Sequence, residues 1–593
     1  MVSFSWLRSG SIPSPPAARS LSLSRLRPIK PAVHNCLPAL LLLLAAVTLA
    51  CNSVNVSPLY RHGAVATTSP VASEVGRQVF IDGGNAYDVA VAVGFALAVA
   101  YPQAGNLGGG GFAVVRDGRS GRIQALDFRE TAPGSADETM YLDDTGAVIP
   151  GLSTYGARAC GVPGSVAGLY ELWRDRGALE WSDLVLRAAR LADTGFLIDE
   201  FLAGALSSYR VELSSFPETA AIFLPGGALL KPGDRLVQKD LARTLYRIAE
   251  EGPGAFYQGP IAVLIDSCMR RHGGLITLSD LQSYVPVWRE PVHFVFDSLD
   301  VYSSPPPSSG GIAVGQILTL LEPYDFSRYN PASPEYMHLF CEASRLVFAD
   351  RAEHLGDPGF YDVPEGLVSE AYLAARRELI QAGRAGSSQN VAAGRPPHGE
   401  SDETTHYSVC DGDGNMVAVT TTINTSFGSK LVVEGAGFLL NNEMDDFAIK
   451  PGFANTYGLV GSEANKIEPG KRMLSSMAPT LVLRQGEPFL ITGSPGGSRI
   501  ITTVAQSILN YTRFGLPLAD AIARPRFHHQ WLPDVVYLEE GGYDVAVMQT
   551  LIKYGHNLEE RSAYGDLQMI AVDAGGFMQA ASDPRQGGAP AGY

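Results

Sequence analysis

The sequence lacks any arrangement of cysteine and histidine typical of a metal site. Its six cysteines are scattered and form neither a CxxC motif nor a cluster with histidine, whereas structural zinc sites need closely spaced ligands of these types. His528 and His529 are adjacent, but neighbouring side chains on a strand point to opposite faces, which argues against a shared metal. The spacing also gives no indication of a disulfide framework, and Cys36 and Cys51 fall in a leader segment.

The chain also lacks an excess of basic residues. Lys and Arg number 45 against 61 Asp and Glu, which gives a formal net charge of −16. Nucleic-acid binders usually carry a basic face, because phosphate contacts dominate their affinity. The charge balance therefore argues against nucleic acid as a partner, while a hydrophobic content of 46% is sufficient for a large buried core.

A long apolar run is missing from the N-terminal leader. The apolar segment Leu37–Ala50 is shorter than the ~20 residues that a membrane span needs, and it follows a stretch that is rich in Arg. Residues 1–50 are therefore predicted to be an export signal. The segment ends in Thr48-Leu49-Ala50-Cys51, which is similar to a lipoprotein cleavage box. We expect an exported protein that is either periplasmic or membrane-anchored through lipidated Cys51.

Two kinds of periodicity divide the rest of the chain. Asn85–Tyr101 is nearly all apolar and rich in alanine, which favours a buried helix, and residues 162–384 show mostly helical spacing. The last third instead contains one amphipathic helix, Arg499–Phe514, among strand patterns joined by short turns. The predicted hairpins are His406–Asp411 with Met416–Thr422, Thr480–Arg484 with Phe489–Thr492, and Gln568–Val572 with Met578–Ala581.

The junction between a polar segment and the first hairpin offers a candidate nucleophile. Residues 384–403 are rich in Gly, Ser and Pro, and they end directly before Thr404 and Thr405. A threonine hydroxyl is a weak nucleophile and needs a base within hydrogen-bond reach. If the peptide bond before Thr404 were cut, its own α-amino group, with a pKa of about 7.7–8.0, would be that base. Two adjacent threonines alone are more often only the start of a strand.

Two glycine-rich segments lie beside predicted strands. Gly493–Ser498 separates a strand from a helix, so the N–H groups of Gly496 and Gly497 are candidates for an oxyanion hole. The alternative is a tight turn without a catalytic role. Gly108–Gly111 is not a phosphate loop, because no Gly-Lys-Ser/Thr sequence follows it.

Charged and hydroxyl side chains in apolar surroundings suggest recognition of an amino acid. Arg129 could grip a carboxylate through two hydrogen bonds, and Glu443 with Asp446 could hold an ammonium group. Ser475 and Ser476 lie in a further apolar segment. Each of these residues, taken alone, is more often part of a solvated or structural ion pair.

Together these segments resemble the bacterial γ-glutamyltransferases, also called glutathione hydrolases. The resemblance covers nearly all of the chain after the leader, and the one departure noted is Ala478 in place of a serine. It is carried by TTHYSV, TTINTSFG, LLNNEMDDF, SSMAPT, TGSPGGSRI, RFHHQWLP and ASDPR, and upstream by GGNAYDVAVAVGFALAV, PQAGNLGGGGF, ALDFRE and PPPSSGGI.

The resemblance implies a fold and a maturation step. The family has the α+β N-terminal-nucleophile hydrolase fold, a four-layer αββα sandwich that two subunits form jointly. A precursor cleaves itself, which here would give a large subunit of residues 51–403 and a small catalytic subunit of residues 404–593. The two subunits would stay associated as a heterodimer.

The resemblance also implies the site residues. The catalytic residues would be Thr404, Thr422, Gly496 and Gly497, and the substrate-binding residues Arg129, Asn424, Glu443, Asp446, Tyr457, Ser475 and Ser476. In the catalytic set, Thr422 orients the nucleophile and the glycines supply the oxyanion N–H groups. In the binding set, the arginine and both serines hold the α-carboxylate, while the asparagine and both acidic residues hold the α-amino group. Tyr457 would belong to a lid loop, 451–461.

The implied reaction is transfer of a γ-glutamyl group. Thr404 would attack the γ-amide of glutathione or a conjugate, and the resulting ester would pass to water, an amino acid or a dipeptide. The resemblance implies no metal and no organic cofactor.

Three alternatives differ in substrate or in the presence of activity. A sister acylase hydrolyses glutaryl-cephalosporins, but a glutaryl group lacks the α-amino group that Asn424, Glu443 and Asp446 would bind. A capsule-anchoring poly-γ-glutamate transpeptidase is less consistent with the lid segment and the full binding set. A surface-binding lipoprotein with an inactive site would not need Thr404, Thr422 and the Gly496-Gly497 pair.

Overall fold

Two seven-stranded sheets, both antiparallel throughout, form the centre of the fold. The computed structural model describes residues 58–393, 405–450 and 463–593. The first sheet has the order β19 (Ala591–Gly592), β2 (Gly63–Thr67), β10 (Thr405–Asp411), β11 (Met416–Thr422), β3 (Gly110–Arg116), β4 (Ile123–Asp127) and β7 (Val287–Arg289). The second has the order β1 (Leu59–Tyr60), β18 (Met578–Ser582), β17 (Gln568–Val572), β13 (Glu487–Thr492), β12 (Thr480–Arg484), β9 (Leu299–Ser303) and β8 (Val292–Phe296).

The two sheets pack against each other through small and medium-sized apolar side chains. Ala66 and Val114 of the first sheet belong to one buried cluster with Leu481, Ile491 and Ile570 of the second. Alternation of side chains along each strand places one set in this interface and the other set toward a helical layer.

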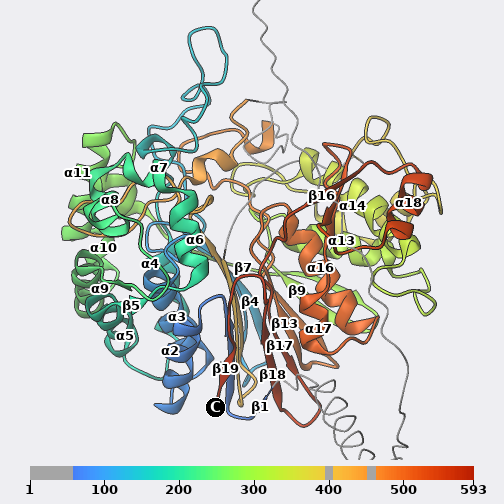
Figure 1. Ribbon diagram of the computed structural model, residues 1–593, viewed down its shortest axis with the longest axis horizontal. Coiled ribbons are helices and arrows are strands. Elements are labelled where there is room, and N and C mark those ends of the chain that lie inside the picture. Colours follow the sequence, from blue (N-terminus) through green and yellow to red (C-terminus); the bar gives the residue numbers. More distant parts are fainter. Residues whose placement is uncertain (1–57, 394–404, 451–462) are drawn as a thin grey trace, which may run out of the picture. The chain divides into compact units, whose positions relative to one another are not determined.

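Helices cover the outer face of each sheet, as Figure 1 shows. The helices beside the first sheet are α2 (Pro70–Ile81), α3 (Ala86–Ala100), α4 (Ser165–Arg174), α5 (Trp181–Thr194), α6 (Glu200–Ser208), α7 (Arg210–Ser214), α8 (Pro217–Phe223), α9 (Lys239–Glu251), α10 (Gly254–Tyr257) and α11 (Pro260–His272). Those beside the second are α13 (Gly310–Leu321), α14 (Pro334–His354), α16 (Arg499–Thr512), α17 (Leu518–Ala523) and α18 (Val545–Tyr554). The predicted αββα sandwich of α+β class is therefore confirmed.

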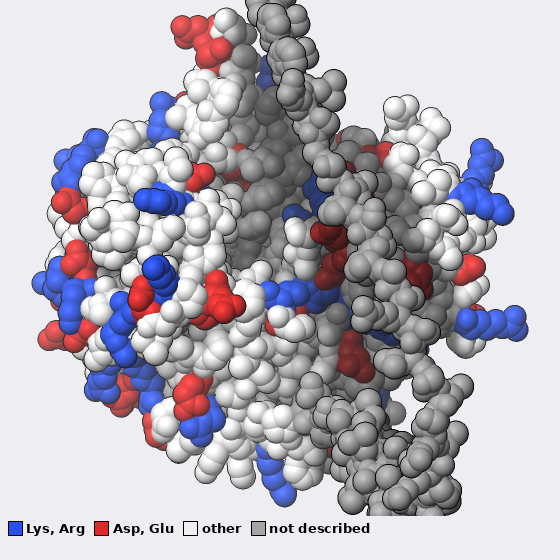
Figure 2. Space-filling model, in the orientation of Figure 1, with Lys and Arg blue, Asp and Glu red and all other residues white. Residues whose placement is uncertain are grey.

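The described residues also contain shorter elements. These include α12 (Leu278–Ser283), α15 (Glu370–Arg377), the pair β5 (Phe196–Leu197) and β6 (Arg235–Leu236), and a small sheet of β14 (Phe527–His528), β15 (Val536–Glu539) and β16 (Leu558–Arg561). None of the helices in the described residues has the length and apolar composition of a membrane span. On the face shown in Figure 2, Lys and Arg side chains are interspersed with Asp and Glu.

Helix α3 shows how local sequence determines a central element. Asn85 caps it, because its side-chain oxygen accepts hydrogen bonds from the N–H groups of Tyr87 and Asp88 at 2.9 and 3.1 Å. Every residue from Ala86 to Ala100 is buried. The prediction of a buried helix over Asn85–Tyr101 is confirmed.

The prediction of a mostly helical region at 162–384 missed one hairpin. Strands β8 and β9 are joined by Asp297 and Ser298, which both adopt positive φ angles of 49° and 63°. Two-residue hairpin turns of this kind favour Asn-Gly, Asp-Gly or Gly-Gly, so an Asp-Ser pair is a weaker hairpin signal. The three hairpins predicted in the last third are present, and α16 begins at the predicted residue.

Candidate active site

A central strand, β10, begins directly after the candidate nucleophile in the sequence. Thr404 itself is outside the described residues, so its role stays a prediction. Thr405 begins β10, is fully buried and pairs with Thr421 of β11. At the next residue, burial lowers the pKa of His406 to about 3, so this ring is neutral at physiological pH.

The end of β11 places two predicted site residues beside this strand. The Thr422 hydroxyl accepts a hydrogen bond from the Asn424 N–H at 2.7 Å. Asn424 has a left-handed φ of 67° and donates its side-chain amide to the Asn442 carbonyl at 3.0 Å. Its side-chain oxygen is buried without a hydrogen-bond partner. An unsatisfied buried acceptor is costly, so this atom is well suited to receive a donor from a ligand.

The glycine run before β3 has a packing role. A Cβ atom on Gly109 would lie 1.9 Å from the Thr422 carbonyl oxygen, and one on Gly108 would lie 2.2 Å from the Leu439 carbonyl oxygen. No side chain fits at either position. The run therefore allows the chain to pack closely against the end of β11, where Thr422 lies.

The predicted oxyanion segment connects β13 to α16. Gly496 and Gly497 have positive φ angles of 128° and 68°, which residues other than glycine rarely adopt. The segment begins beside β10, because a Cβ atom on Gly493 would lie 2.3 Å from the His406 ring. The structure therefore confirms the strand-loop-helix context and brings the loop next to the nucleophile strand, while the catalytic role of the N–H groups stays a prediction.

Arg129, Glu443 and Asp446 come together although they are far apart in the chain. The Arg129 guanidinium donates hydrogen bonds to the carboxylates of both acidic residues, and its Nη1 lies 3.6 Å from Glu130. The guanidinium also donates to the Met473 carbonyl at 3.2 Å and to the next carbonyl at 3.1 Å. The arginine is 1% exposed, and the three acidic residues are equally buried. We call these four residues the head-group cluster.

The head-group cluster holds more acid than base. Burial raises the pKa of Glu443 to about 7, although Arg129 acts in the opposite direction. Burial also raises the pKa of Glu130 well above its usual range, and the charge of Glu443 adds to this effect. One guanidinium cannot neutralise three buried carboxylates, so the cluster retains protons or attracts a cation.

This arrangement suits an α-amino acid head group. A zwitterion brings one carboxylate for Arg129 and one ammonium for Glu443 and Asp446. Ion pairs within the cluster are then replaced by ion pairs to the ligand, and the net charge does not change. The structure joins the three residues in one ion-pair group. Their roles toward substrate stay predictions.

Ser475 and Ser476 extend from the head-group cluster. They follow Leu474, whose carbonyl accepts from Arg129. The N–H of Ser475 donates to the Pro307 carbonyl at 2.8 Å, and the Ser476 hydroxyl accepts from the Arg351 guanidinium at 2.5 Å. The turn before α13 therefore fixes the segment that carries both serines.

Some residues that contact the site were not predicted from the sequence. Glu130 is adjacent to Arg129 and could have been suspected from the doubled charge in an apolar segment. Arg351 contacts Ser476 from α14, and Asp566 contacts residues beside the nucleophile strand. Neither has a sequence signal, because their partners are distant in the chain. Tyr457 lies outside the described residues.

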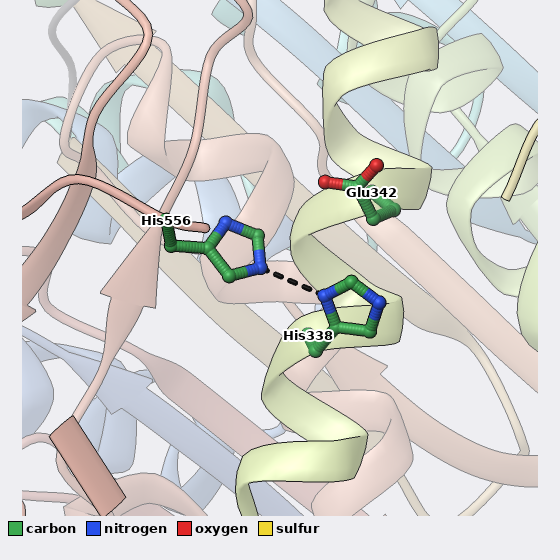
Figure 3. A group of neighbouring side chains, drawn as sticks. All are labelled: His338, Glu342 and His556. Carbon is green, nitrogen blue, oxygen red and sulfur yellow. Dashed lines mark hydrogen bonds between the residues drawn. The ribbon is translucent and has the colours of Figure 1, made fainter. Parts of the chain in front are cut away.

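His338, Glu342 and His556 are the one group of the described residues with the spacing of metal ligands (Figure 3). The two rings share a hydrogen bond of 2.8 Å, and the second nitrogen of His338 lies 2.8 Å from the Gln381 carbonyl. Glu342 accepts from the Arg345 guanidinium at 3.2–3.3 Å and from the Gly386 N–H at 2.9 Å. A metal would have to displace these bonds beside an arginine, so the group is better explained as a hydrogen-bonded link.

His528 and His529 do not share a ligand position. The first ring lies 2.8 Å from the Thr502 hydroxyl and 2.9 Å from the side-chain amide oxygen of Gln530, whereas the second lies 3.2 Å from Asp534. Cysteines 160, 268, 341 and 410 are buried and free.

Fold and site define the class as an N-terminal-nucleophile hydrolase. The family model described as "Gamma-glutamyltranspeptidase" matches residues 72–593. The chain is 46% identical over 527 residues to "Glutathione hydrolase proenzyme" of Escherichia coli (strain K12), covering 88% of this chain and 90% of the relative. The chain therefore belongs to the γ-glutamyltranspeptidase family.

Two solved structures support this assignment in different ways. A cephalosporin acylase from Bacillus halodurans superposes with a TM-score of 0.82 at 27% identity, covering 91% of this chain and 98% of its own. A Helicobacter pylori γ-glutamyltranspeptidase chain is 41% identical with a TM-score of 0.54, and it covers 55% of this chain but 94% of its own. The second therefore corresponds to only part of this precursor.

Proposed function

We propose that this enzyme is a self-processing γ-glutamyltransferase that cleaves the γ-glutamyl bond of glutathione and its conjugates. The observation that carries the proposal is the buried head-group cluster, which offers a guanidinium and acidic side chains to the two charges of an α-amino acid. Family membership and the sequence similarity to glutathione hydrolases support the same reaction. The acceptor of the γ-glutamyl group is water, an amino acid or a dipeptide.

The reaction proceeds through an ester on Thr404. The α-amino group of Thr404 takes the hydroxyl proton as the oxygen attacks the γ-carbonyl carbon, and the N–H groups of Gly496 and Gly497 stabilise the oxyanion. The C–N bond then breaks, and Cys-Gly leaves with that proton. Water or an amine attacks the ester in the second step, which regenerates the Thr404 hydroxyl.

The arrangement of the strands supports two subunits that stay together after cleavage. Residues 404–593 contribute β10, β11 and β19 to the first sheet, and residues 51–403 contribute β2, β3, β4 and β7. The second sheet is mixed in the same way, because β9 of the large subunit pairs with β12 of the small one. Separation would break ladders in both sheets, so the mature enzyme is a heterodimer.

The close superposition on a cephalosporin acylase is an observation in favour of the rival acylase activity. Its glutaryl substrates lack the α-amino group. Without that ammonium, the glutaryl carboxylate would add a negative charge beside Glu443 and Asp446, and Arg129 would be the one cation of the cluster. The acidic side of the head-group cluster therefore favours the γ-glutamyl substrate.

The location of the enzyme is proposed from the leader alone. Residues 1–50 act as an export signal, and the mature enzyme is periplasmic or anchored through lipidated Cys51.

A matched pair of substrates tests the proposed function. γ-Glutamyl-p-nitroanilide and glutaryl-p-nitroanilide differ only in the α-amino group. We expect kcat/KM to favour the γ-glutamyl compound by about 100-fold or more. A substrate without the α-amino group leaves the buried polar groups of the site unpaired. Equal rates, or a preference for the glutaryl compound, would assign the enzyme to the acylases.

A further inference from the structure

Asp566 is a buried acid that the proposed reaction does not use. It lies in the connection between β16 and β17 and is fully buried. Its Oδ2 accepts a hydrogen bond from the Thr68 hydroxyl at 2.5 Å, and its N–H donates to the Ser494 hydroxyl at 3.0 Å. Its Oδ1 is buried without a hydrogen-bond partner. A carboxyl group in this setting needs a reason, since burial of an incompletely paired acid is unfavourable.

The side chain of Asp566 reaches the strand that carries the nucleophile. The Thr68 hydroxyl, which contacts Asp566, also lies 3.2 Å from the hydroxyl of Thr405. Thr405 is bonded directly to Thr404, the proposed nucleophile. Both threonine hydroxyls can donate and accept, so the chain of hydrogen bonds from Thr405 through Thr68 to Asp566 persists whether or not the acid is protonated.

The backbone of Asp566 meets the proposed oxyanion loop. Ser494, which accepts from the Asp566 N–H, belongs to the Gly493–Ser498 segment. A Cβ atom on Gly496 would lie 3.5 Å from the Gly565 Cα, and one on Gly565 would lie 3.1 Å from the Ser494 hydroxyl. The Gly565-Asp566 backbone thus packs against the loop at two points.

Asp566 therefore connects the two components that must be aligned for acyl transfer. We propose that Asp566 is a positioning residue that fixes Thr405, the residue bonded to the proposed nucleophile, through Thr68 and fixes the Gly496-Gly497 loop through its own N–H. This inference rests on the proposed roles of Thr404 and the loop. It assigns Asp566 and Thr68 an effect on self-cleavage and on kcat, because both steps need the nucleophile and the oxyanion donors in register.

The electrostatic setting agrees with a positioning role. Burial, followed by the nearby charge of Asp583, raises the pKa of Asp566 to about 8. The acid is then mostly neutral at pH 7, so it supplies hydrogen bonds and geometry without adding a negative charge beside the oxyanion. An asparagine has nearly the same shape and can make the same hydrogen bond to Thr68.

The test compares isosteric and conservative variants at both residues. Thr68→Val and Asp566→Ala remove hydrogen bonds of the Thr405–Thr68–Asp566 series. They should slow self-cleavage and lower kcat of the cleaved enzyme by about 10- to 100-fold, with KM nearly unchanged. Thr68→Ser and Asp566→Asn keep these hydrogen bonds, so the rate of self-cleavage and kcat should stay within about threefold of wild type. A purely structural role would not produce this split between kcat and KM or the rescue.

Controls keep the test decisive. Thr244→Val removes an equally buried hydroxyl, bonded to the Ala436 carbonyl at 2.8 Å, and should leave kcat unchanged. If Asp566→Ala does not accumulate as folded protein, the isosteric Thr68→Val carries the test. Normal kcat and self-cleavage in Thr68→Val, or the same large defect in Asp566→Asn as in Asp566→Ala, would overturn the inference. Thr404→Ala, measured in parallel, separates this failure from failure of the proposed function, because it must be uncut and inactive if Thr404 is the nucleophile.

Discussion

The candidate site has two buried halves, the head-group cluster and the surroundings of strand β10. The first contains ionised side chains, whereas the titratable side chains of the second are neutral. The head-group cluster keeps Arg129 ionised against Glu443 and Asp446. Around the nucleophile strand, burial lowers the pKa of His406 to about 3 and raises that of Asp566 to about 8, so both groups are neutral at pH 7.

This difference matches two different tasks. A charged region can recognise a zwitterion, because it offers a counter-ion to each end. A neutral region leaves the α-amino group of the nucleophile as the main titrating group near pH 7, which is what a base with a pKa of about 7.7–8.0 requires. Changes in the charged half should therefore alter binding, and changes in the neutral half should alter the rate of chemistry.

The largest effect should come from the neutral half. Gly497→Val places a branched side chain at a φ of 68° and should displace the loop N–H groups. We expect kcat to fall by about 10²–10³, as for loss of one oxyanion donor, with a much smaller change in KM. Steady-state kinetics on the self-cleaved fraction measure both constants.

A matched glycine controls for backbone strain. Gly486 also has a positive φ, of 83°, but lies in the β12–β13 turn, and a Cβ atom there would touch nothing within 4 Å. Gly486→Val should leave kcat close to that of wild type. An equal loss in both variants would mean that strain, rather than oxyanion geometry, explains the result.

The next effect should come from the charged half. Arg129→Lys keeps the charge but cannot make two parallel hydrogen bonds to a carboxylate. We expect KM for γ-glutamyl donors to rise by about 10- to 100-fold, as for loss of a charge-assisted hydrogen bond of about 1.5–3 kcal/mol, while self-cleavage continues. Arg345→Lys, at a buried arginine paired with Glu342 and Asp534, should leave KM unchanged. If both variants behave alike, Arg129 has a structural role only.

A smaller effect should reveal the titration of Glu443. Because burial raises its pKa to about 7, this acid gains its negative charge as the pH rises from 6 to 8, and binding of an ammonium should tighten over that range. We expect the inhibition constant of L-glutamate to fall a few-fold from pH 6 to 8 in the wild type. Glu443→Gln should flatten this dependence. An unchanged slope in the variant would show that another group titrates.

The last prediction concerns stability rather than kinetics. Burial raises the pKa of Asp566 from 3.8 to about 8, so the folded protein retains a proton that the unfolded chain releases. Its contribution to stability is full below pH 4 and decreases as the pH rises toward 8, by at most about 1.4 kcal/mol per pH unit. Asp566→Asn should therefore lose less Tm than the wild type between pH 5 and 8. Identical losses would indicate that the acid is ionised in the folded state.

Local features of the fold were predictable from the sequence, because they depend on neighbouring residues. The hairpin β10–β11 follows from alternation around a Gly-rich turn, and α3 follows from its cap and its apolar run. The β8–β9 hairpin was missed because Asp297 and Ser298 adopt positive φ without the glycine that the preferred two-residue turns contain. What the pattern could not supply was the pairing of these elements across the two sheets.

Site residues were predictable from the sequence where they belong to a motif. Arg129 and Glu443 were singled out from their segments, but their contact joins residues 314 positions apart and could not be derived from spacing. Thr68 and Asp566 are 498 positions apart, and neither belongs to a recognised pattern. Only the folded arrangement of β2 and the β16–β17 connection brings them together.

The central claim is that the chain cuts itself before Thr404 and then uses that residue as its nucleophile. The most direct measurement is the mass and N-terminal sequence of the fragments from purified protein, without added protease, for the wild type and Thr404→Ala. The account predicts a smaller wild-type fragment that begins at Thr404 and a variant that remains full length. A fragment that begins elsewhere, or cleavage of Thr404→Ala at the same bond, would contradict it.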